Sequence, residues 1–318
     1  DPIFENGTIR FNQGLYNGGG LSLNMDAFLS LKGVDIHDNS AELGGGVFTS
    51  WAYLMMEEVH IHGNQAIDGG GIYGDMESNL EMTHCLVADN EAQEDGGGIS
   101  LVEADLEISR STIAGNTAGN NGGAIHCQMY YGEPGSISNS ILWGNYPDEI
   151  SAGSIAPEVY YSNVYGGYAG DGNIDANPLF ESVETGNYHL SWEDYPYASG
   201  AKSPCIDAGD PASAYDPDGT VADMGAFYYH QETVTLIRDQ SEEAFKMFPN
   251  PATHSVQLTA DETIQYVQVL NLAGKVVKKI DINDLAGMLV VSDIPGGIYL
   301  VRVMYAGGNI STQKLVRE

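Results

Sequence analysis

Short stretches in which apolar and polar residues alternate recur along the first two thirds of the chain. Examples are Val34–His37 and Val59–His62, in which every second residue is apolar. A period of two is typical of a β-strand with one buried face. The stretches are rich in β-branched residues and interrupted by glycine, and no helical pattern lies between them. The pattern therefore predicts an all-β fold built from short strands.

These stretches belong to a repeat of 25–27 residues. Each unit contains a glycine run followed by an apolar residue, and the runs begin at Gly18, Gly44, Gly69, Gly96 and Gly122. Each unit also has an asparagine three residues after another apolar position. The series is Asn12, Asn39, Asn64, Asn90, Asn116 and Asn145. A unit of this length made only of strands and turns matches one coil of a parallel β-solenoid, whose coils stack about 4.8 Å apart. We expect inward apolar ladders and an internal ladder of hydrogen-bonded asparagines.

The repeat decays after Asn145. We expect residues 166–230 to form a closing region, because a solenoid end exposes unpaired strand edges. The opposite end shows no comparable cap, so we expect further coils or another domain before Asp1 in the natural protein. The chain begins without Met, which is typical of a processed or truncated chain.

The charge balance changes near residue 239. The whole chain has 44 acidic and 12 basic residues, a net charge of −32, yet residues 239–318 hold nine acidic and seven basic side chains. The polar segment 231–244 is therefore predicted to be a linker. Residues 245–318 contain alternating stretches such as Val256–Leu258 and Val267–Val269, separated by glycine-rich turns. This pattern favours a small immunoglobulin-like β-sandwich.

The repeat region, residues 1–165, resembles the right-handed parallel β-helix proteins of bacterial surfaces. Its Gly-Gly-(Gly/Ala)-Ile units also resemble repeats of polymorphic outer-membrane proteins. The resemblance implies a right-handed β-helix over residues 1–230, closing region included. It indicates fold more than function, because lyases, hydrolases and adhesins share this architecture.

The last module, residues 245–318, resembles the C-terminal sorting domain of type IX secretion substrates. Four motifs carry the resemblance, in order: Phe248–Ala252, Leu272–Val277, Gly296–Val301 and Lys314–Val316. The resemblance implies a Bacteroidetes-type bacterium and export through the periplasm and outer membrane, to the cell surface or the medium. The residues that it marks as the sorting signal are Pro249, Asn250, Pro251, Gly274, Lys275, Gly297, Ile298, Tyr299, Lys314, Leu315 and Val316.

The same resemblance implies partners. They are the type IX translocon, an outer-membrane shuttle barrel and a sortase-like peptidase that removes the domain. We expect cleavage in the linker between Tyr229 and Phe245, because exposed backbone with few contacts is the usual site of proteolysis.

The composition narrows the function of the β-helix. A strongly acidic chain lacks the basic clusters that nucleic acids and anionic membranes require, and it repels polyuronate. Uronate lyases need a basic residue beside the substrate, yet residues 1–230 hold only Arg10, Lys32, Arg110 and Lys202. Adjacent acids such as Asp148 and Glu149 point to opposite faces of a strand, so we interpret them as solvated surface residues rather than acid–base couples.

We therefore expect a carbohydrate-binding or adhesive scaffold more than an enzyme. Two alternatives stay open: a polysaccharide-active lyase or glycoside hydrolase whose catalytic part is outside this segment or unrecognised, and a purely structural surface repeat. Exposed aromatic rows can stack on sugar rings, and the candidates here are Phe48, Trp51, Tyr53 and Tyr73, with Phe48 stacked on Tyr73. The competing interpretation is that these rings cover the flank of the solenoid.

Two groups of residues are candidate metal ligands. Asp216, Asp218 and Asp223 place carboxylates around a glycine turn, which suits calcium, although an Asp-rich turn without an ion gives the same pattern. Asp35 and His37 should point outward on one coil, with His60 and His62 at equivalent positions on the next. Such an N/O cluster suits a transition metal, but outward polar side chains are also the ordinary state of a solvated strand.

Overall fold

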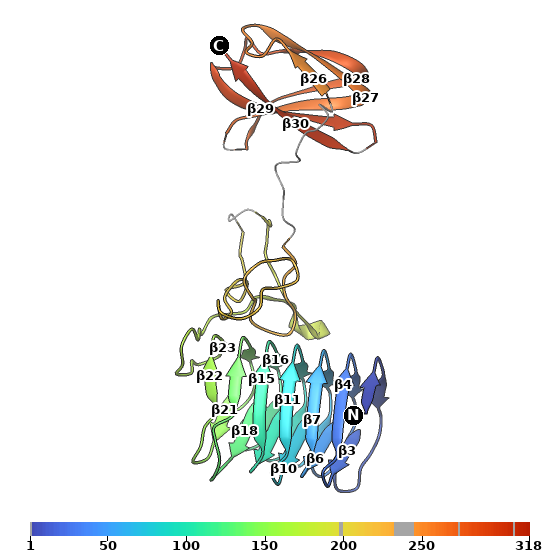
Figure 1. Ribbon diagram of the computed structural model, residues 1–318, viewed down its shortest axis with the longest axis vertical. Coiled ribbons are helices and arrows are strands. Elements are labelled where there is room, and N and C mark those ends of the chain that lie inside the picture. Colours follow the sequence, from blue (N-terminus) through green and yellow to red (C-terminus); the bar gives the residue numbers. More distant parts are fainter. Residues whose placement is uncertain (1, 197–199, 232–244, 273, 308) are drawn as a thin grey trace. The chain divides into compact units, whose positions relative to one another are not determined.

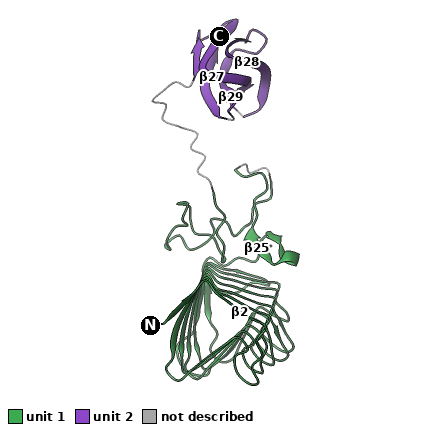
Figure 2. Ribbon diagram, turned by 90° about the vertical axis from the view of Figure 1, so that its right-hand side faces the viewer, with its two compact units in different colours: residues 1–233 green, residues 234–318 purple. Residues whose placement is uncertain are grey.

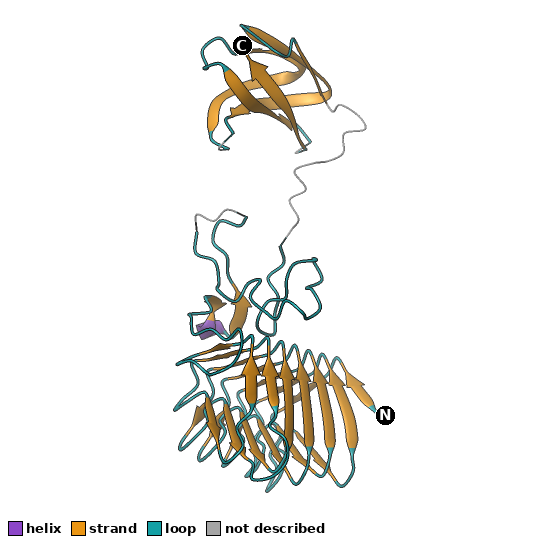
Figure 3. Ribbon diagram, turned by 60° about the vertical axis from the view of Figure 1, so that its left-hand side comes forward, coloured by secondary structure: helices purple, strands orange, loops and turns teal. Residues whose placement is uncertain are grey.

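The computed structural model describes residues 2–196, 200–231, 245–272, 274–307 and 309–318. The predicted linker and cleavage region therefore lie almost entirely outside the described residues. The chain divides into two compact units, residues 1–233 and 234–318 (Figure 2). Within the described part every element is a strand except one short 3-10 helix, η1 (Val183–Thr185) (Figure 3). That part contains no helix with the length and apolarity that a membrane crossing needs.

Three walls of parallel strands form the first unit (Figure 1). Wall A contains β1 (Ile3–Glu5), β4 (Phe28–Lys32), β7 (Tyr53–Glu57), β11 (Asn79–Thr83), β15 (Asp105–Ser109), β19 (Ser136–Ser138) and β22 (Glu158–Tyr160). Wall B contains β2 (Thr8–Arg10), β5 (Asp35–His37), β8 (His60–His62), β12 (Leu86–Ala88), β16 (Thr112–Ala114), β20 (Ile141–Trp143) and β23 (Asn163–Val164). Wall C contains β3 (Leu21–Asn24), β6 (Val47–Ser50), β10 (Ile72–Asp75), β14 (Ile99–Val102), β18 (Ile125–Gln128) and β21 (Ile150–Ala152). A short fourth sheet joins β9 (Gln65–Ala66), β13 (Glu91–Ala92) and β17 (Thr117–Ala118).

Neighbouring coils are aligned residue by residue. In wall B, Ile36 pairs with Ile61, and Ile61 with Val87. In wall C, Val47 pairs with Ile72 in the same way. From the second coil onward these side chains are fully buried in the core, which confirms both predicted apolar ladders.

The chain bends between walls through residues in the left-handed conformation. The corner from wall A to wall B uses Asn6, Gly33, Glu58, His84, Arg110, Asn139 and Tyr161, with φ between 44° and 59°. The corner from wall C to wall A uses Met25, Trp51, Met76 and Glu103, with φ between 51° and 55°. Two further bends follow wall B: one at the residue after each wall B strand, for example Asp38 at φ 54°, and one at the first glycine of each run, for example Gly44 at φ 64°. The second glycine leaves room for the next coil, because a Cβ on Gly45 would lie 2.4 Å from the oxygen of Gly70.

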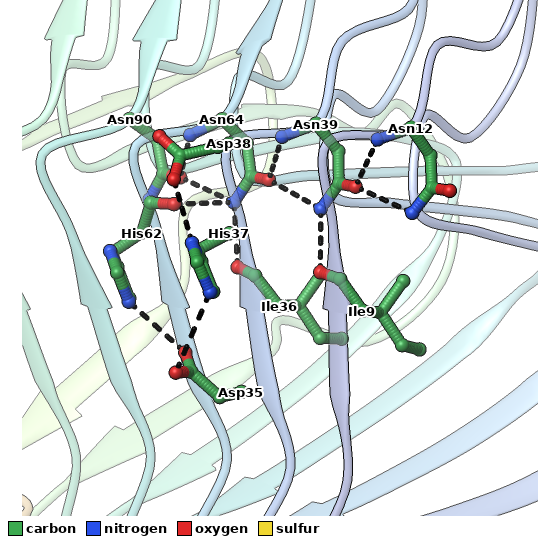
Figure 4. A network of polar contacts seen from close by, with 10 residues as sticks. All are labelled: Ile9, Asn12, Asp35, Ile36, His37, Asp38, Asn39, His62, Asn64 and Asn90. Carbon is green, nitrogen blue, oxygen red and sulfur yellow. Dashed lines mark hydrogen bonds and ion pairs between the residues drawn. The ribbon is translucent and has the colours of Figure 1, made fainter.

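The asparagine ladder runs through the core from coil to coil (Figure 4). Asn39 donates both its main-chain N–H and its Nδ2 to Oδ1 of Asn64, each at 3.0 Å. Asn64 repeats this with Asn90, and the pattern extends from Asn12 to Asn145. Nδ2 of Asn64 also donates to the oxygen of Ile36, at 2.9 Å. The predicted ladder is confirmed, and it satisfies main-chain groups that the turn would otherwise leave unpaired.

A carboxylate ends this ladder. Asn145 donates its N–H to Oε1 of Glu149 at 3.2 Å and its Nδ2 to Oε2 at 2.5 Å. Glu149 is only 5% exposed, and burial raises its pKa to about 7. The expectation that Glu149 is a solvated surface residue is therefore wrong. The last donor pair of the ladder has no further asparagine to bond, and the Glu149 carboxylate accepts from both donors.

The closing region is divided between two surfaces. Residues 171–176 cover the end of the solenoid, where Ile174 exchanges main-chain hydrogen bonds with Ser162 and Val164. The hairpin of β24 (Phe180–Ser182) and β25 (Asn187–Leu190), with residues up to 231, instead packs on the outer face of wall B. Ala226 donates to Thr112 there, and Arg110 forms a 2.8 Å ion pair with Asp216.

The sequence of wall B explains this difference from the expected end cap. Strands β5 and β8 are polar on their outer face, whereas β12 (Leu86-Val87-Ala88) and β20 (Ile141-Leu142-Trp143) are apolar on both faces. A strand that loses its alternation is buried on both sides. The outer residues Leu86, Ala88 and Ile141 are accordingly at most 6% exposed beneath the closing region.

The second unit is an antiparallel β-domain, as the sequence predicts. Its strands are β26 (Phe245–Phe248), β27 (Ser255–Leu270), β28 (Val276–Val290), β29 (Gly297–Tyr305) and β30 (Ile310–Arg317). The register of β27 shifts between Thr259 and Ile264. Its first half pairs with β26 and its second half with β29. The resulting sheet encloses a core that includes Val256, Leu258, Val267 and Val269, all fully buried.

Candidate functional site

The four predicted aromatic residues lie in two different places. Phe48 and Tyr73 are paired neighbours in wall C, and their rings stack 5.8 Å apart at an angle of 2°, as expected. Phe48, however, is only 2% exposed, so its ring offers no open face to a ligand. Tyr73, its neighbour in the same column, is half-buried.

Trp51 lies at the corner between walls C and A, among exposed apolar side chains from neighbouring coils. Met25 and Met76 occupy the same corner on the preceding and following coils, because Asn24, Ser50 and Asp75 before them are aligned. The three side chains are 86%, 50% and 52% exposed in the order Met25, Trp51, Met76. They form a continuous apolar row at the solenoid surface.

Tyr53 extends this row onto wall A, where it pairs with Phe28. The two rings stack 5.3 Å apart at 12°, and both are half-buried. The Tyr53 hydroxyl donates to the Glu81 carboxylate, and this bond raises the pKa of Tyr53 to about 12. We call Met25, Phe28, Trp51, Tyr53 and Met76 the corner ridge.

Sequence reasoning missed Met25, Phe28 and Met76. The signal was available, since each occupies the same place in its repeat unit as Trp51 or Tyr53. Aligning the units at the residue after each wall C strand would have identified them.

The three predicted calcium ligands have protein partners. Asp216 accepts from Arg110 at 2.8 Å and from the N–H of Asp223 at 2.8 Å. Asp218 accepts from Thr220 and from the N–H of Gln231. The two oxygens of Asp223 accept from the N–H groups of Asp207 and Tyr229, and burial raises its pKa to about 7. These carboxylates tie the closing region together, and calcium binding there stays a prediction.

The histidine group has the predicted outward arrangement. Pairing of β5 with β8 aligns Asp35 with His60 and His37 with His62. The rings of His37 and His62 stack 4.8 Å apart at 3° (Figure 4). His60 packs edge-on against Phe227 of the closing region, at 5.6 Å. In this geometry, no three His, Cys, Asp or Glu side chains of the described residues are placed to hold a metal ion.

Three of the four sorting motifs meet on one side of the second unit. Asn250 donates its Nδ2 to the oxygen of Lys314 at 2.7 Å and accepts the N–H of Val316 at 2.9 Å. In the same strand pair, Tyr299 of β29 aligns with Leu315 of β30, and Ile298 with Val316. The Tyr299 hydroxyl donates to the oxygen of Pro295 at 2.8 Å. Motifs 64 residues apart in sequence thus form one surface.

The remaining motif forms the turn between β27 and β28. Gly274 adopts φ 76°, and Lys275 donates its N–H to Oδ1 of Asn271 at 3.0 Å. The residues of the other three motifs differ in exposure. The Ile298 side chain is 43% exposed, whereas the Leu315 side chain is fully buried. The predicted signal residues therefore divide into a folding set and an exposed set.

Comparison with known families gives the two units their identities. Residues 2–147 match the family model of the right handed beta helix region. Residues 246–318 match that of the secretion system C-terminal sorting domain. The chain is a right-handed β-helix protein that ends in a type IX secretion sorting domain. It is therefore a cargo that the type IX system exports to the cell surface or beyond it. No match to the chain is found among curated proteins.

Proposed function

We propose that the β-helix is the working part of this cargo and that it binds neutral carbohydrate through the corner ridge, as a glycan receptor or adhesive scaffold. The observation that carries the proposal is the exposed Trp51 side chain, set between Met25 and Met76 on adjacent coils. Trp presents a large flat face at little cost in conformational entropy, and such faces stack on sugar rings.

The surroundings of the ridge favour a neutral sugar. Carboxylates that accept hydrogen bonds from sugar hydroxyls lie beside it, since Glu81 and Glu107 are aligned on the outer face of wall A. The same carboxylates, and a chain charge of −32, oppose the approach of a polyanionic glycan.

The backbone conformation at Trp51 does not explain why a tryptophan lies there. Its φ of 53° lies in the left-handed region, which costs a residue other than glycine about 1 kcal/mol or more. Glycine fills equivalent bends elsewhere in the coils, for example Gly33 and Gly63. Met25, Met76 and Glu103 share this conformation at the same corner, so the bend itself does not require the ring of Trp51.

The test is a glycan array with the full chain and two substitutions at the same kind of corner. Trp51→Gly removes the ring at a position that glycine accepts without strain, so the fold should be unchanged. Glu103→Gly is the matched control, because Glu103 has φ 51° at the equivalent corner two coils farther along. We expect Trp51→Gly to weaken binding of the selected glycan at least about tenfold and Glu103→Gly to leave it unchanged.

The same experiment separates the alternatives. A purely structural repeat would bind no glycan on the array. A polysaccharide-active enzyme would release reducing ends from the glycan that it binds. Equal binding by the wild type and Trp51→Gly would contradict the ridge as the binding surface.

We infer further that the second unit engages its export partners through the exposed residues of its motifs. The surface where Asn250, Ile298 and Lys314 meet is the docking face that we assign to the shuttle barrel. A sortase-like peptidase then cuts between Tyr229 and Phe245. The substitution Ile298→Asp tests this face, because Ile298 is exposed and the domain should fold without it. We expect lower export with an unchanged melting temperature, and normal export would exclude this residue from the docking face.

A further inference from the structure

A longer turn between walls C and A lies in line with the corner ridge. The residues that end the wall C strands of successive coils are aligned: Ser50, Asp75, Val102 and Gln128. The residue after each of them lies at the corner, so Met129 takes on the fifth coil the place that Trp51 has on the second. Three coil spacings of about 4.8 Å separate these places, roughly 14 Å along the solenoid axis.

This turn is three residues longer than the turn of the preceding coil. Ser136 of β19 pairs with Glu107 of β15, so both lie at the same place after the corner. Glu107 follows the corner residue Glu103 by four positions, whereas Ser136 follows Met129 by seven. We call the lengthened turn, Met129–Gly135, the corner loop.

The corner loop presents two exposed tyrosines on a fixed base. The Met129 side chain is only 4% exposed, and the Met129 oxygen accepts the N–H of Ile155 on the next coil at 3.3 Å. Beyond this base, Tyr130 and Tyr131 are 52% and 82% exposed. The N–H of Tyr130 also donates to Glu103 at 3.3 Å. A long, exposed bond contributes little, so loss of the Glu103 side chain should leave the loop in place.

Polar side chains occupy the coils between the two aromatic groups. Tyr53 of wall A is aligned with Asn79 on the third coil and, through it, with Asp105 on the fourth. Both polar side chains reach the surface, since Asn79 is half-buried and Asp105 is exposed. An amide and a carboxylate can bond sugar hydroxyls. The surface therefore offers rings at both ends of the row and hydrogen-bonding groups between them, which suits a chain of sugars better than one sugar.

We propose that the ligand of the corner ridge is an unbranched, neutral, β-linked polysaccharide that lies along the solenoid axis from Trp51 to Tyr131. This assignment rests on the proposed function, because Trp51 supplies the first contact. An extended β-linked chain advances by nearly one coil spacing, about 4.8 Å, per sugar ring, so successive rings meet successive coils. The curved chain of an α-linked polymer would diverge from a straight row.

The charges of this surface favour a neutral polymer. Neither the corner ridge nor the corner loop contains a basic residue, and the exposed carboxylates of Asp105 and Glu133 lie along the row. The carboxylates of a uronate polymer would therefore meet repulsion and find no counter-charge there.

The dependence of affinity on chain length tests the proposal in the unmodified full chain. Calorimetric titration uses cello-, manno- and xylo-oligosaccharides, each from the disaccharide to the hexasaccharide. We expect at least one series to bind, its hexasaccharide at least about tenfold more tightly than its disaccharide. Maltohexaose, which is α-linked, should bind no better than that disaccharide. Affinity that does not change with length, or no binding by any of the three series, would overturn the proposal.

Substitutions at the two ends of the row distinguish a failure of this proposal from a failure of the proposed function. Tyr130→Ala/Tyr131→Ala should weaken hexasaccharide binding at least about tenfold and leave disaccharide binding unchanged, whereas Trp51→Gly should weaken both. Tyr146→Ala is the matched control and should bind like the wild type, because Tyr146 is an exposed tyrosine in a turn between walls B and C.

The two failures give different results. If Trp51→Gly weakens binding but the double tyrosine variant binds the hexasaccharide like the wild type, the ligand does not reach the corner loop, and only the extended ligand is refuted. If Trp51→Gly has no effect, the proposed function itself is contradicted. The rings that these variants lose are exposed, so unchanged melting temperatures should show that each variant folds.

Discussion

The two units are stabilised by different kinds of contact, which repeat from coil to coil in the β-helix and occur once each in the sorting domain. In the β-helix, each residue type returns at the same position of the next coil, so that Asn64 contacts Asn39 and Asn90 through identical bonds. In the sorting domain, contacts occur once each, and Asn250 joins two segments that no repeat relates. A repeated contact spreads stability along the solenoid, whereas a single contact concentrates it in one place.

The two units also differ in which positions can vary without loss of the fold. The β-helix fixes its inward residues strictly but leaves corner positions free to vary, as the series Met25, Trp51, Met76 and Glu103 shows. In the sorting domain, motif residues such as Leu315 belong to the core, and we propose that other residues of the same motifs recognise the export partners. Substitutions should therefore separate stability from function more cleanly in the β-helix.

The largest expected effect comes from breaking one rung of the ladder. Asn64→Ala removes the acceptor for both donors of Asn39 and the Nδ2 donor to the Ile36 oxygen. We expect the first unit to lose about 3 kcal/mol, because each buried group left unpaired costs about 1–3 kcal/mol. Denaturant unfolding of the full chain measures it. Asn24→Ala, at an exposed position, should change little, and an unchanged midpoint for Asn64→Ala would refute the stabilising role of the ladder.

The end of the ladder should make the first unit sensitive to pH. Burial raises the pKa of Glu149 from its ordinary value of 4.5 to about 7, so the folded state holds a proton that the unfolded chain releases. The stability from this group is complete below about pH 4.5 and declines as the pH rises to about 7, by roughly 2–3 kcal/mol. Glu149→Gln should flatten this part of the profile, although Asp223 contributes a decline in the same direction.

Stability measured from pH 4 to 8 in the wild type and Glu149→Gln provides the comparison. Glu158→Gln is a control, because Glu158 is an exposed carboxylate of wall A. Parallel curves for the wild type and Glu149→Gln would show that Glu149 does not titrate in this range.

A smaller effect is expected from the single contact in the sorting domain. Asn250→Ala removes the two bonds to β30, and we expect the second unit to lose about 1–2 kcal/mol. The first unit should unfold as before, because the two units are compact on their own. Calorimetry of the full chain measures the unfolding transition of each unit. Gln265→Ala is the control, because Gln265 is an exposed residue of β27. A shift of both transitions would contradict independent units.

Calcium should give the smallest effect. If Asp216, Asp218 and Asp223 bind it, millimolar Ca²⁺ raises the melting temperature of the first unit more than Mg²⁺ does. Their existing partners limit the expected gain. Equal shifts with both ions would indicate charge screening alone.

The features that repeat in every coil could be predicted from the sequence. The period fixes which residues stack, so the apolar ladders and the bonds of Asn64 could be foreseen without a structure. It could not reveal the role of Glu149, because that residue acts once, where the ladder stops. The burial of Phe48 was also missed, since alternation along β6 predicts an outer position for its ring, yet β6 is buried at three successive residues.

The closing region shows a signal that was present but not used. Leu86-Val87-Ala88 lacks the alternation of Asp35-Ile36-His37 at the same place in the repeat. That loss predicts a covered outer face, although not which segment covers it. The contact of Arg110 with Asp216, more than 100 residues away, has no sequence signature that we can name.

We propose that the first unit is the part that functions outside the cell, while the second unit directs export. The most direct measurement is the mass of the exported protein, expressed as the full chain in a bacterium with a type IX system. We expect a product that ends between Tyr229 and Phe245 and keeps the whole β-helix, with no export when residues 245–318 are deleted. An exported protein that still carries Leu315, or export without the second unit, would contradict it.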